Sequence, residues 1–309
     1  MRFWALGLVA LLSIPRPQAG EHPPPSDNTL SPPAAGVSVY FTRDPLARRD
    51  LVLSGDPLAR VTWHRDRPAF PGDRPGSLTA LYDATQPAGL MGFALPDVWT
   101  QHDPFTALAV FVIRSERFLA DPAGFFQISW GFWNSRTTGL NRTGRPDDFA
   151  GDAFELLEFD YFPNRSVFGG PFLSPTVTGA AIRDAPLFPL LGSFANFTFA
   201  SVEVGLPLDT PLAALVEHRP GDGAWVVSVF RILANGRLLP LDGAVTVVPL
   251  DGLSLRQYQV DTLGLTLWHD GFTGDTPSVR ATLTYHALLA RPGVGWAPGV
   301  LLHAPAHVR

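Results

Sequence analysis

The chain has 309 residues, of which 46% are hydrophobic and 17% are charged, and its formal net charge is −5. This composition is typical of a globular protein with a sizeable core. The acidic balance, with no run of basic residues, argues against nucleic acid as a partner. The sequence contains no cysteine, which excludes disulfides and thiolate metal sites. All 23 basic residues are arginine, which favours coding bias in a GC-rich bacterial genome.

The N-terminus predicts export. Met1 and Arg2 precede the apolar run FWALGLVALLSI and the exit PRPQAG, a pattern typical of a secretory signal peptide over residues 1–20. The run is too short to span a bilayer, which needs about 20 residues. No later segment has the length and hydrophobicity of a membrane anchor. We therefore expect a secreted protein, extracellular or periplasmic, without a transmembrane segment after signal cleavage.

A Pro-rich linker over residues 21–35 is followed by one predicted domain, residues 36–309. The 31 prolines and 29 glycines disfavour long helices. Short apolar runs between turn residues are typical of strands. The expected strands are residues 37–42, 59–63, 77–84, 106–114, 124–133, 153–162, 176–182, 193–205, 224–233, 244–248, 258–269 and 279–289.

Two further local patterns complete this assignment. Residues 211–218, PLAALVEH, favour a short helix, and Asn235-Gly236 predicts a two-residue hairpin turn. Twelve or more strands exceed what one strongly twisted open sheet accommodates, so they are expected to form two packed layers. The predicted fold is all-β: a two-sheet antiparallel jelly-roll sandwich.

The segment FELLEFDYFPN, residues 154–164, places carboxylates in a run that otherwise indicates a buried strand. Alternate residues of a strand share a face, so one face turns from apolar to acidic where Glu158 and Asp160 lie. Pro163 ends the strand, and Asn164 follows it. Two carboxylates, a carboxamide oxygen and a free backbone carbonyl form the kind of oxygen cluster that calcium prefers.

Within this segment, EFDYFPN resembles the metal-binding segment of legume lectins, the concanavalin A group. Those proteins carry Glu-apolar-Asp-x-aromatic-x-Asn on a strand of a two-sheet jelly roll. The resemblance implies that Glu158 holds a transition metal and that Asp160 bridges it to calcium. It further implies that the carbonyl of Phe162 and the side-chain oxygen of Asn164 coordinate the calcium. The matching positions are Glu158, Phe159, Asp160, Phe162, Pro163 and Asn164.

The chain departs from the family pattern after this segment. Gly169 and Gly170 stand where the family has a second Asp, and no His occurs between the segment and His218. Half of the transition-metal shell is therefore missing, which favours a single calcium ion over a metal pair. The alternative is structural: the carboxylates lie on a solvated concave face or pair with an arginine such as Arg142 or Arg165.

A catalytic role for the same strand is the second possibility. The laminarinase-like glycoside hydrolases of the same fold use Glu-x-Asp-x-Glu or Glu-x-Asp-x-x-Glu, and a retaining mechanism needs two carboxyl groups about 5–5.5 Å apart. Here Glu158 and Asp160 are followed by Phe162 and Pro163, so the second Glu is absent. Glu155 does not replace it, because alternation directs it to the opposite face. No catalytic residue is therefore assigned.

A lyase that uses tyrosine and histidine is the other enzymatic alternative. Tyr161, Tyr258 and Tyr285 are available, and nothing in the sequence places them together. His269 and His286 are expected to be polar surface or edge groups. The enzyme alternatives are thus a glycoside hydrolase or polysaccharide lyase with an altered acid/base pair.

The stretch QISWGFWNSRTTGLNRTG, residues 127–144, suggests a ligand-binding face. Aromatic rings beside amide and guanidinium groups bind sugars, because the rings stack on CH faces while the polar groups bond to hydroxyls. The alternative is that both tryptophans are core residues. The candidate ligand-binding residues are Trp130, Trp133, Asn134, Arg136 and Asn141.

These observations favour a secreted, lectin-like carbohydrate-binding protein that is not an enzyme and that binds one calcium ion. The chain also resembles uncharacterised secreted bacterial domains of the concanavalin A-like fold, in which an acidic-aromatic strand precedes a Pro-Thr-Val segment, here SPTV at residues 174–177. A hydrolase or lyase and a structural cell-surface domain without a small ligand remain the alternatives. The sequence does not specify the glycan or the oligomeric state.

Overall fold

The computed structural model describes one compact unit, which lies within Ala34–Arg309. The predicted signal peptide, residues 1–20, and the Pro-rich segment, residues 21–35, lie outside the described residues. Among the residues that are described, no helix has the length and hydrophobicity needed to cross a membrane. The described residues are 36–83, 89–117, 127–135, 155–163, 169–179, 197–250, 258–267 and 280–295.

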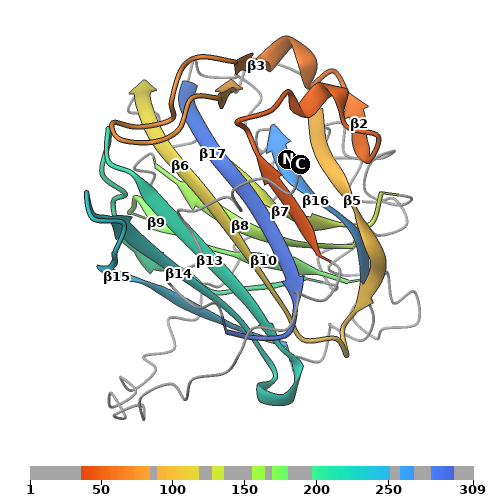
Figure 1. Cartoon of the computed structure of the whole chain (residues 1–309). Helices are drawn as coiled ribbons and strands as arrows, with labels where there is room; N and C mark the ends of the chain where they lie inside the picture. Colours follow the sequence, from red (N-terminus) through yellow and green to blue (C-terminus); the bar gives the residue numbers. More distant parts are fainter. Residues whose placement is uncertain are drawn as a thin grey trace, which may run out of the picture. The chain divides into compact units, whose positions relative to one another are not determined.

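The strands form two antiparallel sheets, and Figure 1 looks onto the first sheet with the second behind it. The first sheet has eight strands. In spatial order they are β15 (Leu238–Pro249), β14 (Ala224–Ile232), β13 (Leu212–Arg219), β6 (Phe105–Arg117), β17 (Arg280–Pro292), β4 (Ser77–Asp83) and β3 (Val61–His64), with β1 (Val37–Tyr40) paired to β17.

The second sheet has nine strands. In spatial order they are β11 (Phe197–Phe199), β10 (Thr176–Thr178), β8 (Leu156–Phe162), β7 (Ile128–Trp133), β16 (Gln259–Leu267), β5 (Gly89–Thr100) and β2 (Leu51–Gly55), with β9 (Phe172–Leu173) on β8 and β12 (Val202–Glu203) on β9. Three short 3-10 helices connect strands: η1 (Pro45–Ala47), η2 (Leu58–Arg60) and η5 (Pro220–Asp222). The predicted all-β, two-sheet antiparallel sandwich is confirmed.

Two local predictions have different outcomes. A hairpin turn at Asn235-Gly236 joins β14 to β15, as predicted, but its loop has three residues instead of two: the Leu233 N–H donates to the Arg237 carbonyl over 2.9 Å, and Gly236 alone has a positive φ, 80°. The helix expected over residues 211–218 is wrong, because this segment is strand β13, paired to β6 on one side and to β14 on the other. A strand buried on both faces is apolar throughout, and periodicity alone does not separate it from a buried helix.

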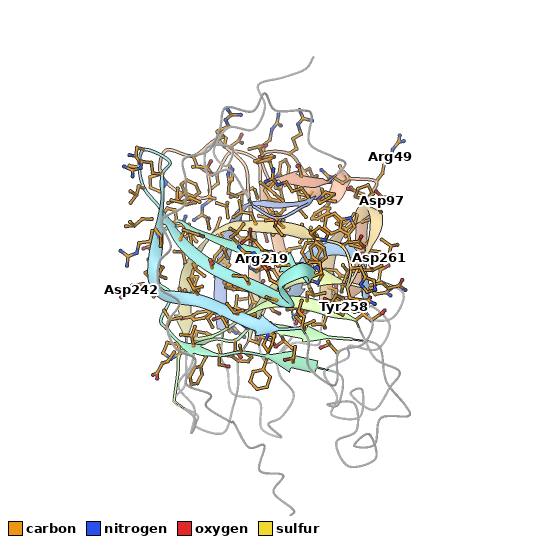
Figure 2. All side chains as sticks on the ribbon, turned by 90° about the horizontal axis from the view of Figure 1, so that it is seen from below. Arg49, Asp97, Arg219, Asp242, Tyr258 and Asp261 are labelled. Atoms are coloured by element: carbon orange, nitrogen blue, oxygen red, sulfur yellow. The ribbon has the colours of Figure 1, made fainter. Side chains whose placement is uncertain are left out.

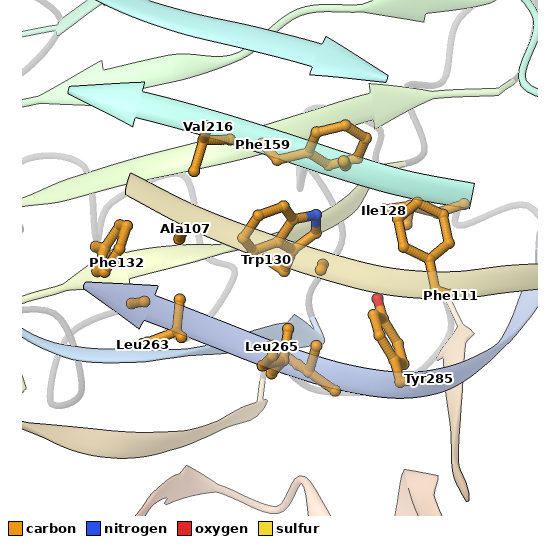
Figure 3. Packing of buried hydrophobic residues seen from close by; sticks show 14 of the residues in the cluster. Ala107, Phe111, Ile128, Trp130, Phe132, Phe159, Val216, Leu263, Leu265 and Tyr285 are labelled. Carbon is orange, nitrogen blue, oxygen red and sulfur yellow. The ribbon is translucent and has the colours of Figure 1, made fainter. Parts of the chain in front are cut away.

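One continuous apolar core fills the space between the sheets. Alternation decides which residues enter it: Trp130 on β7 and Phe159 on β8 point into the core, and their rings stack with centroids 5.6 Å apart. Figure 3 shows this pair among the packed side chains of both sheets. We call the core-facing side of each sheet its inner face and the opposite side its outer face.

A hydrogen-bonded pair of tyrosines joins the two sheets inside this core. The Tyr82 hydroxyl on β4 donates to the Ser129 carbonyl on β7 over 3.0 Å and lies 2.8 Å from the Tyr285 hydroxyl. Because the Tyr82 proton goes to Ser129, Tyr285 donates to Tyr82. Burial raises the pKa of both tyrosines well above their usual value, so both remain protonated donors at physiological pH.

The substitution Tyr82→Phe tests this connection. We expect the free energy of unfolding to fall by about 1–3 kcal/mol, because the Tyr285 hydroxyl then lies buried without its acceptor. Urea denaturation of the wild-type and variant proteins measures the loss. Tyr40→Phe is the control, since the half-exposed Tyr40 hydroxyl makes no hydrogen bond within the described structure. Equal losses in the two variants would contradict the assigned role.

Candidate functional site

The acidic residues of β8 lie on the outer face of the nine-stranded sheet. Leu157 and Phe159 enter the core, so Glu158 and Asp160 point to the other side, as the alternation predicts. Both carboxylates are nevertheless buried, with 1% of each residue exposed. Burial of a charged group is costly unless that group is hydrogen-bonded. The hydrogen-bond partners of the two carboxylates therefore determine what this strand can do.

Each carboxylate accepts a hydrogen bond from a different neighbouring segment. Thr266 Oγ1, on β16, donates to Glu158 Oε1 over 2.6 Å. Gln127 Nε2, just before β7, donates to Asp160 Oδ1. The two side chains share a face, but in the described structure they bond to separate partners.

These contacts bear on the predicted calcium set of Glu158, Asp160, Phe162 and Asn164. Calcium requires six to eight oxygen ligands, whereas the described part of this set supplies two carboxylates that already accept hydrogen bonds. Within the described residues, no group of three or more His, Asp or Glu side chains is arranged to bind a metal ion. Asn164 lies outside the described residues. The predicted set contains only two carboxylates beside a carbonyl and an amide, so the four-residue calcium set stays a prediction.

Three glycines form a row across the same sheet. Gly264 on β16 pairs with Gly92 on β5 and with Gly131 on β7. A Cβ at Gly264 would lie 2.2 Å from the Met91 carbonyl oxygen and 2.4 Å from the Trp133 ring. The missing side chains therefore allow the Trp133 ring to lie against the backbone of β16 and β5.

The two tryptophans of β7 have different environments. Trp130 is fully buried in the inter-sheet core, where a bound ligand cannot reach it, so its assignment as a ligand-binding residue is not supported. Trp133 lies on the outer face with Leu90 and Leu156, in a small apolar cluster separate from the core. It is also buried, with 1% exposed. Trp133 thus fixes the end of β7 against the sheet.

The residue after Trp133 begins a polar cluster at the end of β7. Asn134 Nδ2 donates to Glu155 Oε2 over 2.5 Å, and the Asn134 N–H donates to the Glu155 carbonyl over 3.0 Å. The Gln259 N–H, at the start of β16, donates to Glu155 Oε1 over 3.2 Å. Glu155 therefore joins the ends of three neighbouring strands.

Asp261 extends this cluster on β16. Ser135 donates to it twice, from its N–H and from its Oγ, each over 2.8 Å. The Thr262 hydroxyl donates to the same carboxylate over 2.8 Å. The pairing of β16 with β5 is irregular between Val260 and Thr262, and such bulges re-aim side chains.

We call the five residues Asn134, Ser135, Glu155, Gln259 and Asp261 the rim cluster. Gln259 is exposed, and Ser135 and Asp261 are half-buried. Asn134 and Glu155 are buried beneath them. The cluster combines two carboxylates, the Asn134 amide and the Ser135 hydroxyl, which hydrogen bonds hold in place, with the Gln259 side-chain amide. Of the predicted ligand-binding residues, only Asn134 belongs to it. Arg136 and Asn141 lie outside the described residues.

Sequence reasoning missed four of these five residues. Glu155 was set aside because it faces away from Glu158, and Ser135, Gln259 and Asp261 carried no motif. The relevant signal was the order of strands in the sheet, which brings the end of β7 beside the starts of β8 and β16. A single sequence does not specify that order.

A histidine–tyrosine pair lies directly beside the rim cluster. His218 Nδ1, on β13, donates to the Asp103 carbonyl over 2.6 Å, so Nε2 accepts the hydrogen bond from the Tyr258 hydroxyl. The His218 ring stacks on Phe105 with centroids 4.5 Å apart and lies near Trp225. Both members of the pair are buried, with His218 0% and Tyr258 3% exposed.

This environment moves the pKa values of both side chains away from neutral pH. Burial lowers the pKa of His218 to about 4, although the Asp103 carbonyl partly opposes the shift. Burial also raises the pKa of Tyr258. The structure thus brings together a tyrosine and a histidine that the sequence left apart, but as a buried neutral pair out of reach of a substrate.

The His218 shift predicts acid sensitivity. Between pH 6.5 and pH 4 the unfolded chain binds a proton at His218 that the folded chain does not bind. The stability that neutral His218 contributes is complete above pH 6.5 and is lost as the pH falls toward 4. We expect a loss of about 3 kcal/mol across this range.

Urea denaturation at several pH values measures this effect. The substitution His218→Gln should remove this component of the pH dependence, and His102→Gln, at an exposed position, should leave it unchanged. Parallel pH profiles of the wild-type protein and His218→Gln would refute the assignment.

The other late histidine differs from its sequence-based expectation. His286, expected at the surface or an edge, is 4% exposed, and its Nδ1 lies 2.8 Å from Asp73 Oδ2. Phe70 and Tyr40 pack around its ring. Residues 69 and 70 cover the outer face of the eight-stranded sheet here, which is why a strand position expected to be exposed is buried. His269 lies outside the described residues.

No protein-family model matches the chain, and no curated protein matches it. Solved lectin structures are similar to it. The Emp47p carbohydrate recognition domain is 13% identical, with 83% of this chain and 95% of that chain covered and a TM-score of 0.45. Peanut lectin with a 9-residue peptide is 13% identical, and the match covers 85% of this chain and 100% of the lectin chain, with a TM-score of 0.43. Lectin I from Ulex europaeus, in complex with the methyl glycoside of α-L-fucose, is 11% identical. This match covers 84% of this chain and 99% of the lectin chain, with a TM-score of 0.42. The strand pairing of the chain itself shows a two-sheet antiparallel β-sandwich, and likenesses at these values add no argument to it.

Proposed function

We propose that this protein is a non-enzymatic carbohydrate-binding protein and that the rim cluster is its binding site. The observation that carries the proposal is the fixed set of sugar-bonding groups at the end of β7. Asp261 and Ser135 lie half-buried at the rim, with the Asn134–Glu155 pair directly beneath them. Carboxylate, amide and hydroxyl groups bind the hydroxyls of a sugar, and groups already held by the fold lose little entropy on binding.

The burial pattern supports binding over catalysis. Acid/base catalysis requires a titrating group within hydrogen-bond reach of the substrate. His218 and Tyr258 bond to each other below the surface, and the carboxylates of β8 accept hydrogen bonds from Thr266 and Gln127. Within the described structure no geometry supports the hydrolase or lyase alternative.

Export is part of the proposal. The sequence of residues 1–20 supports secretion, and an extracellular or periplasmic address would expose the rim cluster to glycans. If the protein binds no glycan, the remaining alternative is a structural surface domain without a small ligand.

A glycan array of the purified mature chain tests the proposal. We expect binding to a defined set of glycans, and we expect Asp261→Asn to weaken it at least tenfold, because one charge-assisted acceptor is lost. Asp242→Asn is the matched control, since Asp242 is an exposed carboxylate on β15 of the other sheet (Figure 2 labels both Asp242 and Asp261). Absence of any bound glycan, or equal losses in the two variants, would contradict the proposal.

Carbohydrate binding at the rim cluster should not depend on calcium. Glu155 and Asp160 are five residues apart on an extended segment, which corresponds to roughly 16 Å. We therefore expect glycan affinity to be unchanged by EDTA. Loss of binding in EDTA, with recovery on adding calcium, would refute this independence.

A separate measurement, thermal melting, tests calcium binding at β8. If the predicted set binds calcium, the melting temperature rises with calcium concentration, because the ion binds only the folded state. Asp160→Asn should then abolish the rise, while Asp242→Asn should preserve it. No shift at millimolar calcium would remove the metal prediction.

A further inference from the structure

We propose that the His218–Tyr258 pair makes the rim cluster acid-sensitive, so that the protein binds its glycan at neutral pH and releases it in acid. This inference rests on the proposed function, because it describes the regulation of that same site. It is argued from the contacts that lead from His218 to the rim.

The pair joins the two sheets next to the site. His218 ends β13 of the eight-stranded sheet, and Tyr258 lies directly before β16 of the nine-stranded sheet. Tyr258 also exchanges backbone contacts with Gln101: the Gln101 N–H donates to the Tyr258 carbonyl over 3.2 Å, and the Tyr258 N–H donates to Gln101 Oε1 over 3.4 Å. The start of β16 is thus fixed by contacts on both sides.

The next residue along the chain belongs to the rim cluster. Gln259 donates its N–H to Glu155, which in turn accepts from Asn134. Figure 2 labels Tyr258 and Asp261, three residues apart at the start of β16. A displacement of Tyr258 therefore moves the donor that orients Glu155.

Protonation of His218 removes the geometry that holds Tyr258. His218 Nδ1 already donates to the Asp103 carbonyl, so only the neutral ring offers an acceptor at Nε2. The imidazolium presents an N–H to the Tyr258 hydroxyl instead, and the hydroxyl hydrogen loses its acceptor inside a buried environment. Leaving a buried donor unmatched is unfavourable, so the protonated ring favours an opened rim.

The charged groups around His218 do not cancel this effect. The Asp103 carboxylate favours the imidazolium, but it also accepts hydrogen bonds from the Thr100 N–H and hydroxyl, each over 2.8 Å. Glu217 and Arg219, the sequence neighbours of His218, alternate to the other face of β13 and pair with each other. Tyr258 is protonated throughout the acid range. Burial of the ring therefore dominates.

The size of the effect follows from linkage. An opening that returns His218 to water restores its ordinary affinity for protons. With a folded-state pKa of about 4, such an opening becomes more favourable by roughly ten- to thirty-fold at pH 5. The rim cluster itself contains the carboxyl groups of Glu155 and Asp261, so the experiment must separate their contribution from that of His218.

Amide hydrogen exchange measures the opening without any ligand. The probes are the Gln259 and Ser135 N–H groups, which donate to Glu155 and Asp261. After correction for the intrinsic pH dependence of exchange, their protection should fall roughly ten- to thirty-fold between pH 7 and pH 5. Val110, in the centre of β6, should keep higher protection than both probes at each pH, because core amides exchange only through larger openings.

Two variants identify the cause. His218→Gln retains an acceptor and a donor but does not titrate, so the fall in protection should disappear while the site carboxylates remain. Tyr258→Phe removes the contact itself and should lower Gln259 protection already at pH 7.

Three outcomes would overturn the proposal: unchanged Gln259 protection in the wild-type protein, an equal fall in His218→Gln, or Gln259 protection as high as that of Val110, which would indicate exchange through global unfolding. Because no glycan is used, these outcomes are distinguishable from failure of the glycan array at pH 7.

Discussion

Burial of both faces of the central strands is the constraint on which the structure depends. Strands β7, β8 and β16 pack against the apolar core with their inner faces, and their outer faces are buried as well. A polar side chain on either face must therefore find a partner within the protein. Glu158 and Asp160 meet this requirement through Thr266 and Gln127. The two carboxylates of the acidic strand are thus held inside the protein, whereas the half-exposed polar groups of the rim cluster lie where the strands end.

The glycine row determines where that end lies. Because Gly264 and Gly92 carry no side chains, the Trp133 ring can lie against two strands and hold the end of β7 close to β16. Asn134 and Ser135 follow immediately, so their donors face Glu155 and Asp261 instead of solvent. An aromatic residue that sequence patterns associate with sugar stacking acts here by positioning polar groups. The proposed binding chemistry belongs to its neighbours along the chain.

Sequence reasoning was strongest where local pattern determines structure. Alternation placed Glu158 and Asp160 on one face and Trp130 and Trp133 on opposite faces, as the structure has them. It was weaker wherever strand order decides. Glu155 was set aside for facing away from Glu158, yet the pairing of β7, β8 and β16 makes it the centre of the rim cluster. Strand order depends on contacts distant in sequence, which a single sequence does not reveal.

The two hydrogen-bonded connections between the sheets have different chemistry. Tyr82 and Tyr285 lie within the core, and burial raises the pKa of both, so their contact persists at all physiological pH values. The His218–Tyr258 contact contains a group that titrates in mild acid, and it lies beside the half-exposed rim. Acid therefore weakens one end of the sandwich while the tyrosine connection between the sheets is retained. The acid response therefore begins at the end of the molecule that carries the proposed site.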